Sequence, residues 1–209
     1  MTLKKLSILV AVGVVFALGC SKRVTVEVPP RVNLTSFDVI GIVQFETDAE
    51  GKLAAFTTQR FVETVQHAQP GVRMLELGSA GEVLEAIGHH EIDFRAIKAM
   101  KEHFGVDAVV VGELIVDDIR PNIDLQSMMS TMSVSAEVDA FLAVRMYETA
   151  MGSTIWTRST NRTSTVAHVG VGGGSIDFDA QDPERAYGAL ADALVQDVTR
   201  DFRVTYARQ

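Results

Sequence analysis

The chain has 209 residues, a formal net charge of −8 and a hydrophobic content of 47%. This composition is that of a globular protein, and the negative charge argues against nucleic acid binding, which depends on neutralising phosphates with Lys and Arg. The one cysteine excludes a disulfide within the chain.

The N-terminal segment has the pattern of a cleaved secretory signal. Lys4 and Lys5 precede thirteen uncharged, mostly apolar residues, 6–18, which is the order of a charged region followed by a hydrophobic region. As a helix this run would be only about 20 Å long, too short for a hydrocarbon core of about 30 Å. The sequence therefore predicts a signal peptide over 1–19.

The residues Ala17-Leu18-Gly19-Cys20 resemble a lipobox, the recognition site for bacterial lipoprotein maturation, with the usual order of Leu and small residue reversed. The resemblance implies cleavage before Cys20 and acylation of its sulfur and its new amine. Two or three acyl chains hold a protein on a membrane stably, because each buried CH₂ contributes about 0.8 kcal/mol. Ser21, where an Asp would retain the protein in the inner membrane, resembles an outer-membrane address. The alternative is an ordinary secretory signal with an unmodified cysteine.

Cleavage would leave 190 residues with 17 basic and 27 acidic side chains, a net charge of −10. This length suits one domain, and the charge argues against a polybasic contact with a membrane surface. Residues 20–36 are predicted to form a lipidated tether, in which Pro29-Pro30 stiffens the chain toward polyproline II. Residues 37–209 are predicted to form a single domain.

The first half of that domain alternates strands and helices. Apolar runs predict strands, of which the first is central in a sheet, and spacing near 3.6 residues predicts helices. Ser79 and Glu82 form a capping-box pattern, and Gly105 is a C-terminal stop. The predicted strands are 38–45, 72–77 and 106–116; the predicted helices are 49–67, a short one from Ser79, and 93–104.

The second half begins with a polar loop around Pro121-Asn122. From Val134 to Met146 every even position is apolar, the period of a strand with one buried face. Residues 148–153 are expected to turn into a returning strand that starts at 154–158 and fades into 167–169. Residues 170–174 are expected to be a mobile glycine loop. Asp182-Pro183 then starts the last helix, whose apolar spacing runs to Phe202. The order β-α-β-α-α-β-β-β-α predicts an α/β fold: a mixed sheet with helices packed on it.

Three stretches of this pattern resemble the bacterial lipoprotein group of the curli secretion subunit CsgG and the penicillin-binding-protein activator LpoB. They match the opening strand, a "GAD-apolar-apolar-G" strand and a "D-x-x-T-G-x-I-x-W" hairpin of that group, with Glu148 and Met151 replacing the Asp and the Thr. The resemblance covers most of 37–203 and implies a CsgG/LpoB-like fold. The stretches are 39–45, 104–114 and 142–156.

The resemblance implies one of two functions. A CsgG-like protein would contribute two membrane hairpins to an oligomeric outer-membrane secretion pore, from about 118–135 and 164–181. These segments are poorly patterned for membrane strands, which alternate apolar and polar residues over about 9–11 positions. The favoured interpretation is an LpoB-like, outer-membrane-anchored protein on the periplasmic face, acting as an adaptor or assembly factor that binds envelope proteins or itself. The pore subunit remains the alternative.

No motif for catalysis or for a cofactor is found, so the sequence predicts a protein that is not an enzyme and carries only the covalent lipid on Cys20. His89-His90-Glu91 is better explained as a solvated helix end than as a metal site. Asp117-Asp118 with Asp124 lacks the ligand order of a calcium loop. No metal is expected.

Four side chains on the predicted hairpin are candidate partner contacts. Phe141, Arg145 and Tyr147 lie on the strand face opposite the apolar one, which suggests either a partner or a covering helix. Trp156 is either an anchor of the core, the common position of a single Trp, or an interface hot spot. The sequence leaves both choices open.

Overall fold

The computed structural model of the chain describes residues 25–48, 52–117, 120–122, 135–167, 170–172, 175–177 and 183–208. The chain divides into two compact units, one made of residues 1–29 with 204–209 and the other of residues 30–203. The second unit contains the sheet and its helices. Its helical segments are η1 (Leu34–Ser36), α2 (Leu53–Ala68), α3 (Ala80–Ile87), α4 (Phe94–Phe104), α5 (Pro183–Val198) and η3 (Thr199–Phe202).

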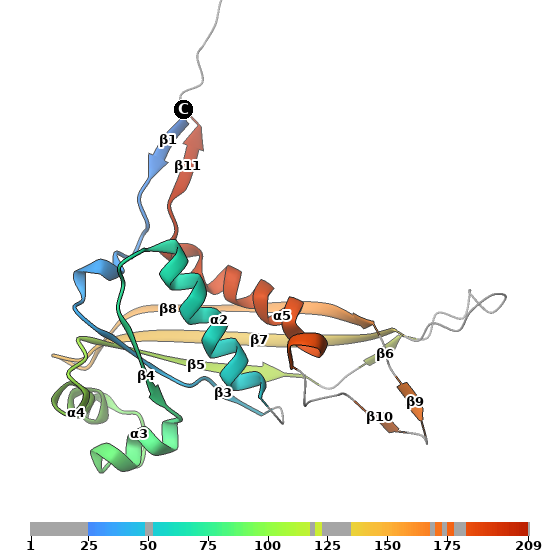
Figure 1. Cartoon of the computed structure of the whole chain (residues 1–209), viewed down its shortest axis with the longest axis horizontal. Coiled ribbons are helices and arrows are strands. Elements are labelled where there is room, and N and C mark those ends of the chain that lie inside the picture. Colours follow the sequence, from blue (N-terminus) through green and yellow to red (C-terminus); the bar gives the residue numbers. More distant parts are fainter. Residues whose placement is uncertain are drawn as a thin grey trace, which may run out of the picture. The chain divides into compact units, whose positions relative to one another are not determined.

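The described strands of this unit form a seven-stranded mixed sheet and a separate small hairpin (Figure 1). The strands of the sheet run β4-β2-β5-β7-β6, with β3 beside β5 and β8 beside β7. β2 pairs in parallel with both β4 and β5, whereas β5, β6 and β8 pair antiparallel with β7. The strands are β2 (Ile40–Val43), β3 (Glu46–Thr47), β4 (Met74–Gly78), β5 (Ala108–Val116), β6 (Arg120–Asn122), β7 (Ser135–Glu148) and β8 (Ser153–Ala167); the hairpin is β9 (Gly170–Gly172) with β10 (Ser175–Asp177).

The long hairpin of β7 and β8 confirms the predicted alternation. The even side chains of β7 point into the core, where Val138, Leu142, Val144 and Met146 are fully buried. Because side chains alternate along a strand, the odd ones face the other way. The register with β8 shifts between Met146 and Tyr147, which leaves Ile155 as an extra residue.

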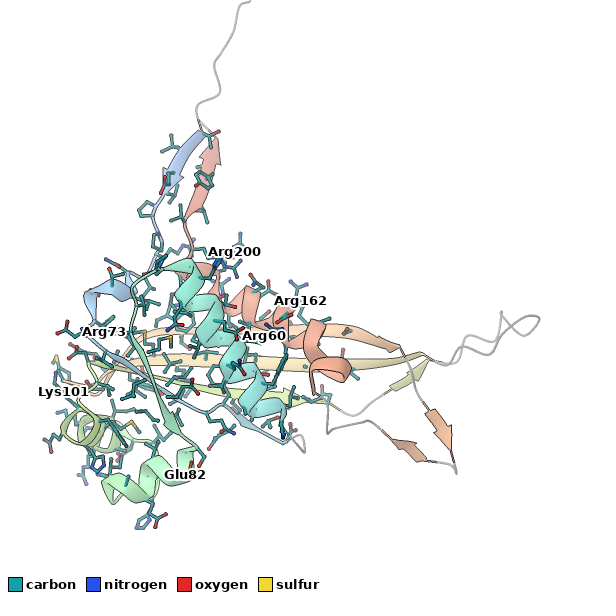
Figure 2. All side chains as sticks on the ribbon, in the orientation of Figure 1. Arg60, Arg73, Glu82, Lys101, Arg162 and Arg200 are labelled. Carbon is teal, nitrogen blue, oxygen red and sulfur yellow. The ribbon has the colours of Figure 1, made fainter. Side chains whose placement is uncertain are left out.

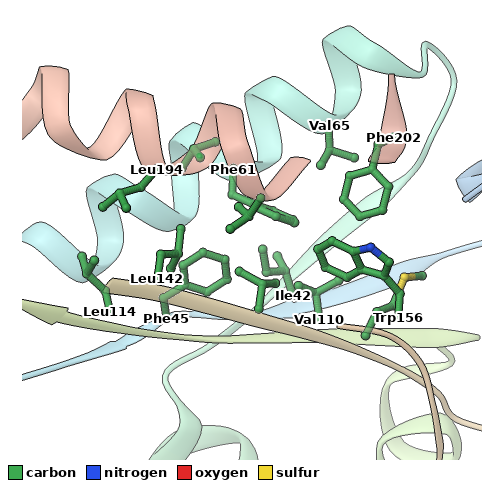
Figure 3. Packing of buried hydrophobic residues seen from close by; sticks show 14 of the residues in the cluster. Ile42, Phe45, Phe61, Val65, Val110, Leu114, Leu142, Trp156, Leu194 and Phe202 are labelled. Atoms are coloured by element: carbon green, nitrogen blue, oxygen red, sulfur yellow. The ribbon is translucent and has the colours of Figure 1, made fainter. Parts of the chain in front are cut away.

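One face of the sheet packs against α2 and α5 and forms the main core (Figure 3). Three aromatic rings connect the layers: the Phe61 ring lies edge-on to Phe45 at 5.4 Å and to Phe202 at 6.3 Å. The buried side chain of Gln69 joins the ends of this unit. It accepts a hydrogen bond from the Leu34 N–H and donates to the carbonyls of Val32 and Phe202.

On the other face, α3 and α4 cover β4, β2 and the start of β5, and the half-buried Tyr147 at the end of β7 packs against the same cluster (Figure 1). Both helices begin as the sequence predicts. Ser79 Oγ accepts from the Glu82 N–H while the Glu82 carboxylate accepts from the Ser79 N–H, and the Asp93 side chain caps α4. Figure 2 shows Glu82 at the start of α3. Gly105 ends α4 with φ of 69°, a left-handed conformation that glycine adopts without strain.

The predicted fold class is confirmed, and α3 and α4 begin at the predicted caps. The first helix was predicted over 49–67, whereas α2 is Leu53–Ala68, and the structure adds short strands to the predicted order. The polar loop around Pro121-Asn122 is β6, because residues 120–122 pair with the start of β7. The predicted glycine loop, 170–174, begins with β9, which pairs with β10 directly after the loop. The returning strand runs from Ser153 to Ala167. Phe202 lies in η3 rather than in the last α-helix.

The predicted tether also contains regular structure. η1 lies within 20–36, and its Leu34 is buried in the main core. In the other unit, β1 (Thr25–Val28) pairs antiparallel with β11 (Thr205–Arg208), so that Val26 lies opposite Ala207 and Glu27 opposite Tyr206. We call this two-stranded element the terminal ribbon. Residues 24–28 alternate apolar and polar side chains, but their partner strand lies at the other end of the chain, where no local pattern relates the two.

A substitution at Gly112 of β5 tests how tightly the main core is packed. A Cβ added there would lie 2.6 Å from the buried Phe45 ring, so Gly112→Ala must displace an aromatic side chain. We expect the free energy of unfolding to fall by about 1–3 kcal/mol, measured by urea denaturation. Gly81→Ala on α3 is the control, because its added Cβ meets nothing within 4 Å. An equal effect of both substitutions would contradict this packing.

Candidate functional site

The strongest candidate site is the part of the second sheet face that no helix of the described residues covers. It consists of the outward-facing side chains of β5, β7 and β8, and we call it the open face. Phe141 and Ile155 are 38% and 41% exposed there, and Arg145 is exposed. These strands pair antiparallel, and an antiparallel sheet can leave one face to water, but large apolar side chains exposed on that face mark a candidate contact surface.

The strand register arranges the open face in rows. Phe141 lies between Ile115 of β5 and Asn161 of β8, and the next row brings Glu113, Ala143 and Ser159 together. In the third row Arg145 lies between Val111 and Thr157. Apolar side chains therefore come mainly from β5 and β7, and small polar ones from β8.

A hollow of about 200 Å³ lies at the border between the open face and α3. Its apolar wall includes Val43, Ala80 and Ile92, and its polar lining comes from Gln44, Glu46, Glu113, Arg145 and Tyr147. Two of the four predicted contact residues, Arg145 and Tyr147, thus border this hollow. Phe141 lies further along β7, in the row of Ile115.

The two carboxylates of the hollow are juxtaposed by strand pairing. Glu46 of β3 lies opposite Glu113 of β5, an arrangement in which like charges repel. Within the described residues, neither carboxylate forms an ion pair or hydrogen bond, and neither does the Arg145 guanidinium. The hollow therefore offers two acidic acceptors to a cation beside an apolar wall, with one arginine at its edge.

Trp156 lies on the other side of the sheet, in the main core. It is 8% exposed, its ring centroid is 4.6 Å from that of Phe202, and its Nε1 donates to Asp201 Oδ2 at 3.3 Å. Of the two alternatives for Trp156, the structure shows the core anchor. The pairing explains this, since Trp156 lies opposite the inward-facing Met146.

Asp201 collects three partners at this point. Its carboxylate accepts from Arg158 Nη1 at 2.8 Å as well as from Trp156, and Arg31 Nη1 lies 3.7 Å away. Burial by itself would raise the pKa of Asp201, but the hydrogen bonds from Arg158 and Trp156, with the charges of Arg158 and Arg31, together lower it. The ionised form of Asp201 therefore stabilises the fold.

The other groups with shifted pKa values have structural roles too. Hydrogen bonds from Ser79 lower the pKa of Glu82, and bonds from the Ala96 and Arg95 N–H groups lower that of Asp93. Both are helix caps. Burial lowers the pKa of Arg203, which donates to Thr199 Oγ1 at 3.0 Å. These three groups therefore hold helix ends in place.

Several predicted positions fall outside the described residues. They include Cys20 and Ser21, Asp118 and Asp124, and most of the two segments considered for a pore, so the lipid, the sorting signal and the pore alternative stay predictions. His89 and His90 follow the end of α3, as expected for a solvated helix end. Across the described ranges, no three His, Cys, Asp or Glu side chains come together as metal ligands, and no helix there has the length and apolarity needed to span a membrane.

Sequence reasoning missed Gln44, Glu46 and Glu113 as site residues. Glu113 was visible as the charged residue that interrupts the apolar run of 106–116. Glu46 follows the first predicted strand, and only the pairing of β3 with β5 brings it to Glu113. That pairing involves two residues on β3, which is too short to leave a periodic signal.

The structure defines a mixed α/β domain with one fully covered and one half-covered sheet face. Neither a protein-family model nor a curated protein matches the chain. Among solved structures, the PelC dodecamer of Paraburkholderia phytofirmans is 12% identical, covers 90% of this chain and 99% of its own, and has a TM-score of 0.43.

Two further solved structures are similar. Lipoprotein GNA1162 of Neisseria meningitidis is 14% identical over 78% of this chain and 95% of its own, with a TM-score of 0.43. The LpoB C-terminal domain of Salmonella enterica is 10% identical over 65% and 84%, with a TM-score of 0.35. At these identities and TM-scores, none of the three structures assigns this chain a family or a function.

Asp201→Asn tests the ion-pair cluster behind Trp156. Because hydrogen bonds to charged groups contribute about 1.5–3 kcal/mol, we expect a loss of that size in unfolding free energy at pH 7. The lowered pKa means that this stabilisation is present above the ordinary Asp pKa and is lost as the pH falls through the folded-state pKa. The unfolding free energies of the wild type and of Asp201→Asn, measured by denaturation at a series of pH values, should therefore converge only below about pH 4.

Asp38→Asn is the control for this substitution. Asp38 pairs with Arg73 at 3.3 Å, but the two side chains are 90% and 67% exposed. Exposed pairs contribute little, so we expect a change within about 0.5 kcal/mol. If Asp201→Asn were as mild as Asp38→Asn, the proposed stabilising role of Asp201 would be wrong.

Proposed function

We propose that this protein is a lipid-anchored adaptor of the bacterial cell envelope, held at the outer membrane through Cys20. Its open face would bind a segment of a partner envelope protein. The observation that carries the proposal is the uncovered sheet face, with its hollow lined by Glu46, Glu113 and Arg145. The proposal assigns the protein a binding role and no catalytic step.

The anchor is inferred from the N-terminal residues. The short apolar run ends at Gly19-Cys20, and the chain has no second cysteine to pair with that thiol. Acylation would confine the domain to a surface and so raise the effective concentration of the open face for a partner on the same membrane. A low affinity of the open face for its partner would then be sufficient for binding on the membrane.

The chemistry of the open face defines the partner. Phe141 and Ile115 offer apolar contact in one row, and aromatic side chains are enriched at interfaces. Glu46 and Glu113 have no cationic partner among the described residues. A partner segment with an apolar side chain for the Phe141 row and a Lys or Arg for the hollow would complement both features.

Intact-mass analysis tests the anchor. The protein made in a Gram-negative host should lack residues 1–19 and carry a covalent lipid, and Cys20→Ala should abolish both changes because the sulfur is the acceptor. Ser21→Asp should keep the lipid but move the protein to the inner-membrane fraction. An unmodified thiol on the native product would refute the lipid anchor.

Photo-cross-linking tests the partner surface. A benzoylphenylalanine in place of Phe141, in the lipid-anchored protein in intact cells, should give one discrete adduct that mass spectrometry identifies as an envelope protein. The matched control is the same substitution at Phe94 of α4, which is more exposed at 56% but lies outside the open face. Glu46→Gln with Glu113→Gln should reduce the Phe141 adduct severalfold. Equal adducts at both positions, or none at Phe141, would exclude this surface.

A further inference from the structure

The net charge of the chain conceals an uneven distribution. Residues 20–32 and 200–209 contain six basic and two acidic side chains, whereas residues 33–199 contain eleven basic and twenty-five acidic ones. The two terminal segments thus carry +4 and the rest of the mature chain −14. The net charge alone argues against a basic contact with a membrane. The uneven distribution, however, leaves the two ends of the chain basic.

The fold brings the two basic segments together. In the terminal ribbon, β1 pairs with β11 along its whole length. In the other unit, the N–H groups of Arg31 and Val32 both donate to the Asp201 carbonyl. Each unit therefore joins a piece of the N-terminal segment to a piece of the C-terminal one.

Part of this basic charge is unpaired or only weakly paired. The Arg31 side chain is 83% exposed and forms a long ion pair of 3.7 Å with Asp201, whose carboxylate is also bound by Arg158 and Trp156. Arg200 is exposed, with no ion pair to any described residue, and Figure 2 shows it beyond the end of α5. Two arginines are therefore available to an anionic partner.

The terminal ribbon also exposes apolar and aromatic side chains. Val26 and Val28 are 37% and 39% exposed, and Tyr206 is 69% exposed. A two-stranded ribbon is marginally stable by itself in water, and Tyr is enriched at the interface between lipid and water. Both properties favour a lipid surface as the neighbour of this element.

The distance to the lipid is short. Only five residue steps separate Cys20 from Thr25, and an extended chain spans at most about 3.6 Å per residue, so the ribbon begins within about 18 Å of the attachment point. We propose that the basic residues at the two chain ends bind the anionic headgroups of the bilayer that holds the anchor. This inference rests on the proposed lipid anchor.

Vesicle sedimentation tests the contact without the anchor. The chain from residue 20 with Cys20→Ala, which cannot be acylated, should bind vesicles of equal parts phosphatidylcholine and phosphatidylglycerol and not vesicles of phosphatidylcholine alone. Since each arginine near such a surface contributes about fivefold in partition, Arg31→Ala with Arg200→Ala should weaken binding about 25-fold. Added salt should weaken it as well, because exposed charges are screened.

The matched control removes the same charge elsewhere. Arg95→Ala with Lys98→Ala takes two exposed cations from α4, and vesicle binding should stay within about twofold of the parent. Equal losses in both double variants, binding to neutral vesicles, or no binding to anionic vesicles would each overturn the proposal. Because the assay contains no acyl chain, its failure is distinct from failure of the lipid anchor, which intact mass reports.

Discussion

The alternation of β7 is the constraint on which the rest of the structure depends. This strand pairs with β5 and β6 on one edge and with β8 on the other, so its register fixes the orientation of side chains on three neighbours. A slip of one residue would carry the buried Leu142 and Val144 to the surface and Arg145 into the core. The cost of burying an unpaired charge makes that alternative register inaccessible.

The same register places Trp156 and Arg145 on opposite faces of the sheet, although the sequence suggested one role for both. Trp156 and Arg145 both belong to the hairpin, and we considered them together as partner contacts. The structure directs Trp156 to Phe202 and Asp201 in the core and Arg145 to the hollow on the other face. The core side of the sheet is thereby fixed by aromatic packing and a partly buried carboxylate, while the other side carries charged groups that no described residue pairs.

Features with a local signal could be predicted from the sequence. The capping box of Ser79 and Glu82 and the glycine stop at Gly105 depend on residues a few positions apart, and the structure confirms both. Features made by distant segments could not be predicted. β3 and β6 are too short for any periodicity, and the three hydrogen bonds of Gln69 join residues more than 30 positions away.

For the candidate site, the sequence indicated the strand face but not the acidic pair. Phe141 and Arg145 were recognisable because an outer strand face is expected to carry small polar side chains, and these two side chains are large. Glu46 and Glu113 are 67 residues apart in the chain, and nothing short of the strand pairing relates them. The acidic pair of the candidate site is thus assembled by topology, whereas the strand face beside it is encoded locally.

The pairing of β1 with β11 has a practical consequence for studies of this protein in cells. It brings the last residues of the chain alongside Thr25, so a fluorescent protein or purification handle attached after Gln209 would emerge beside the N-terminal strand β1 and not at a separate end of the chain.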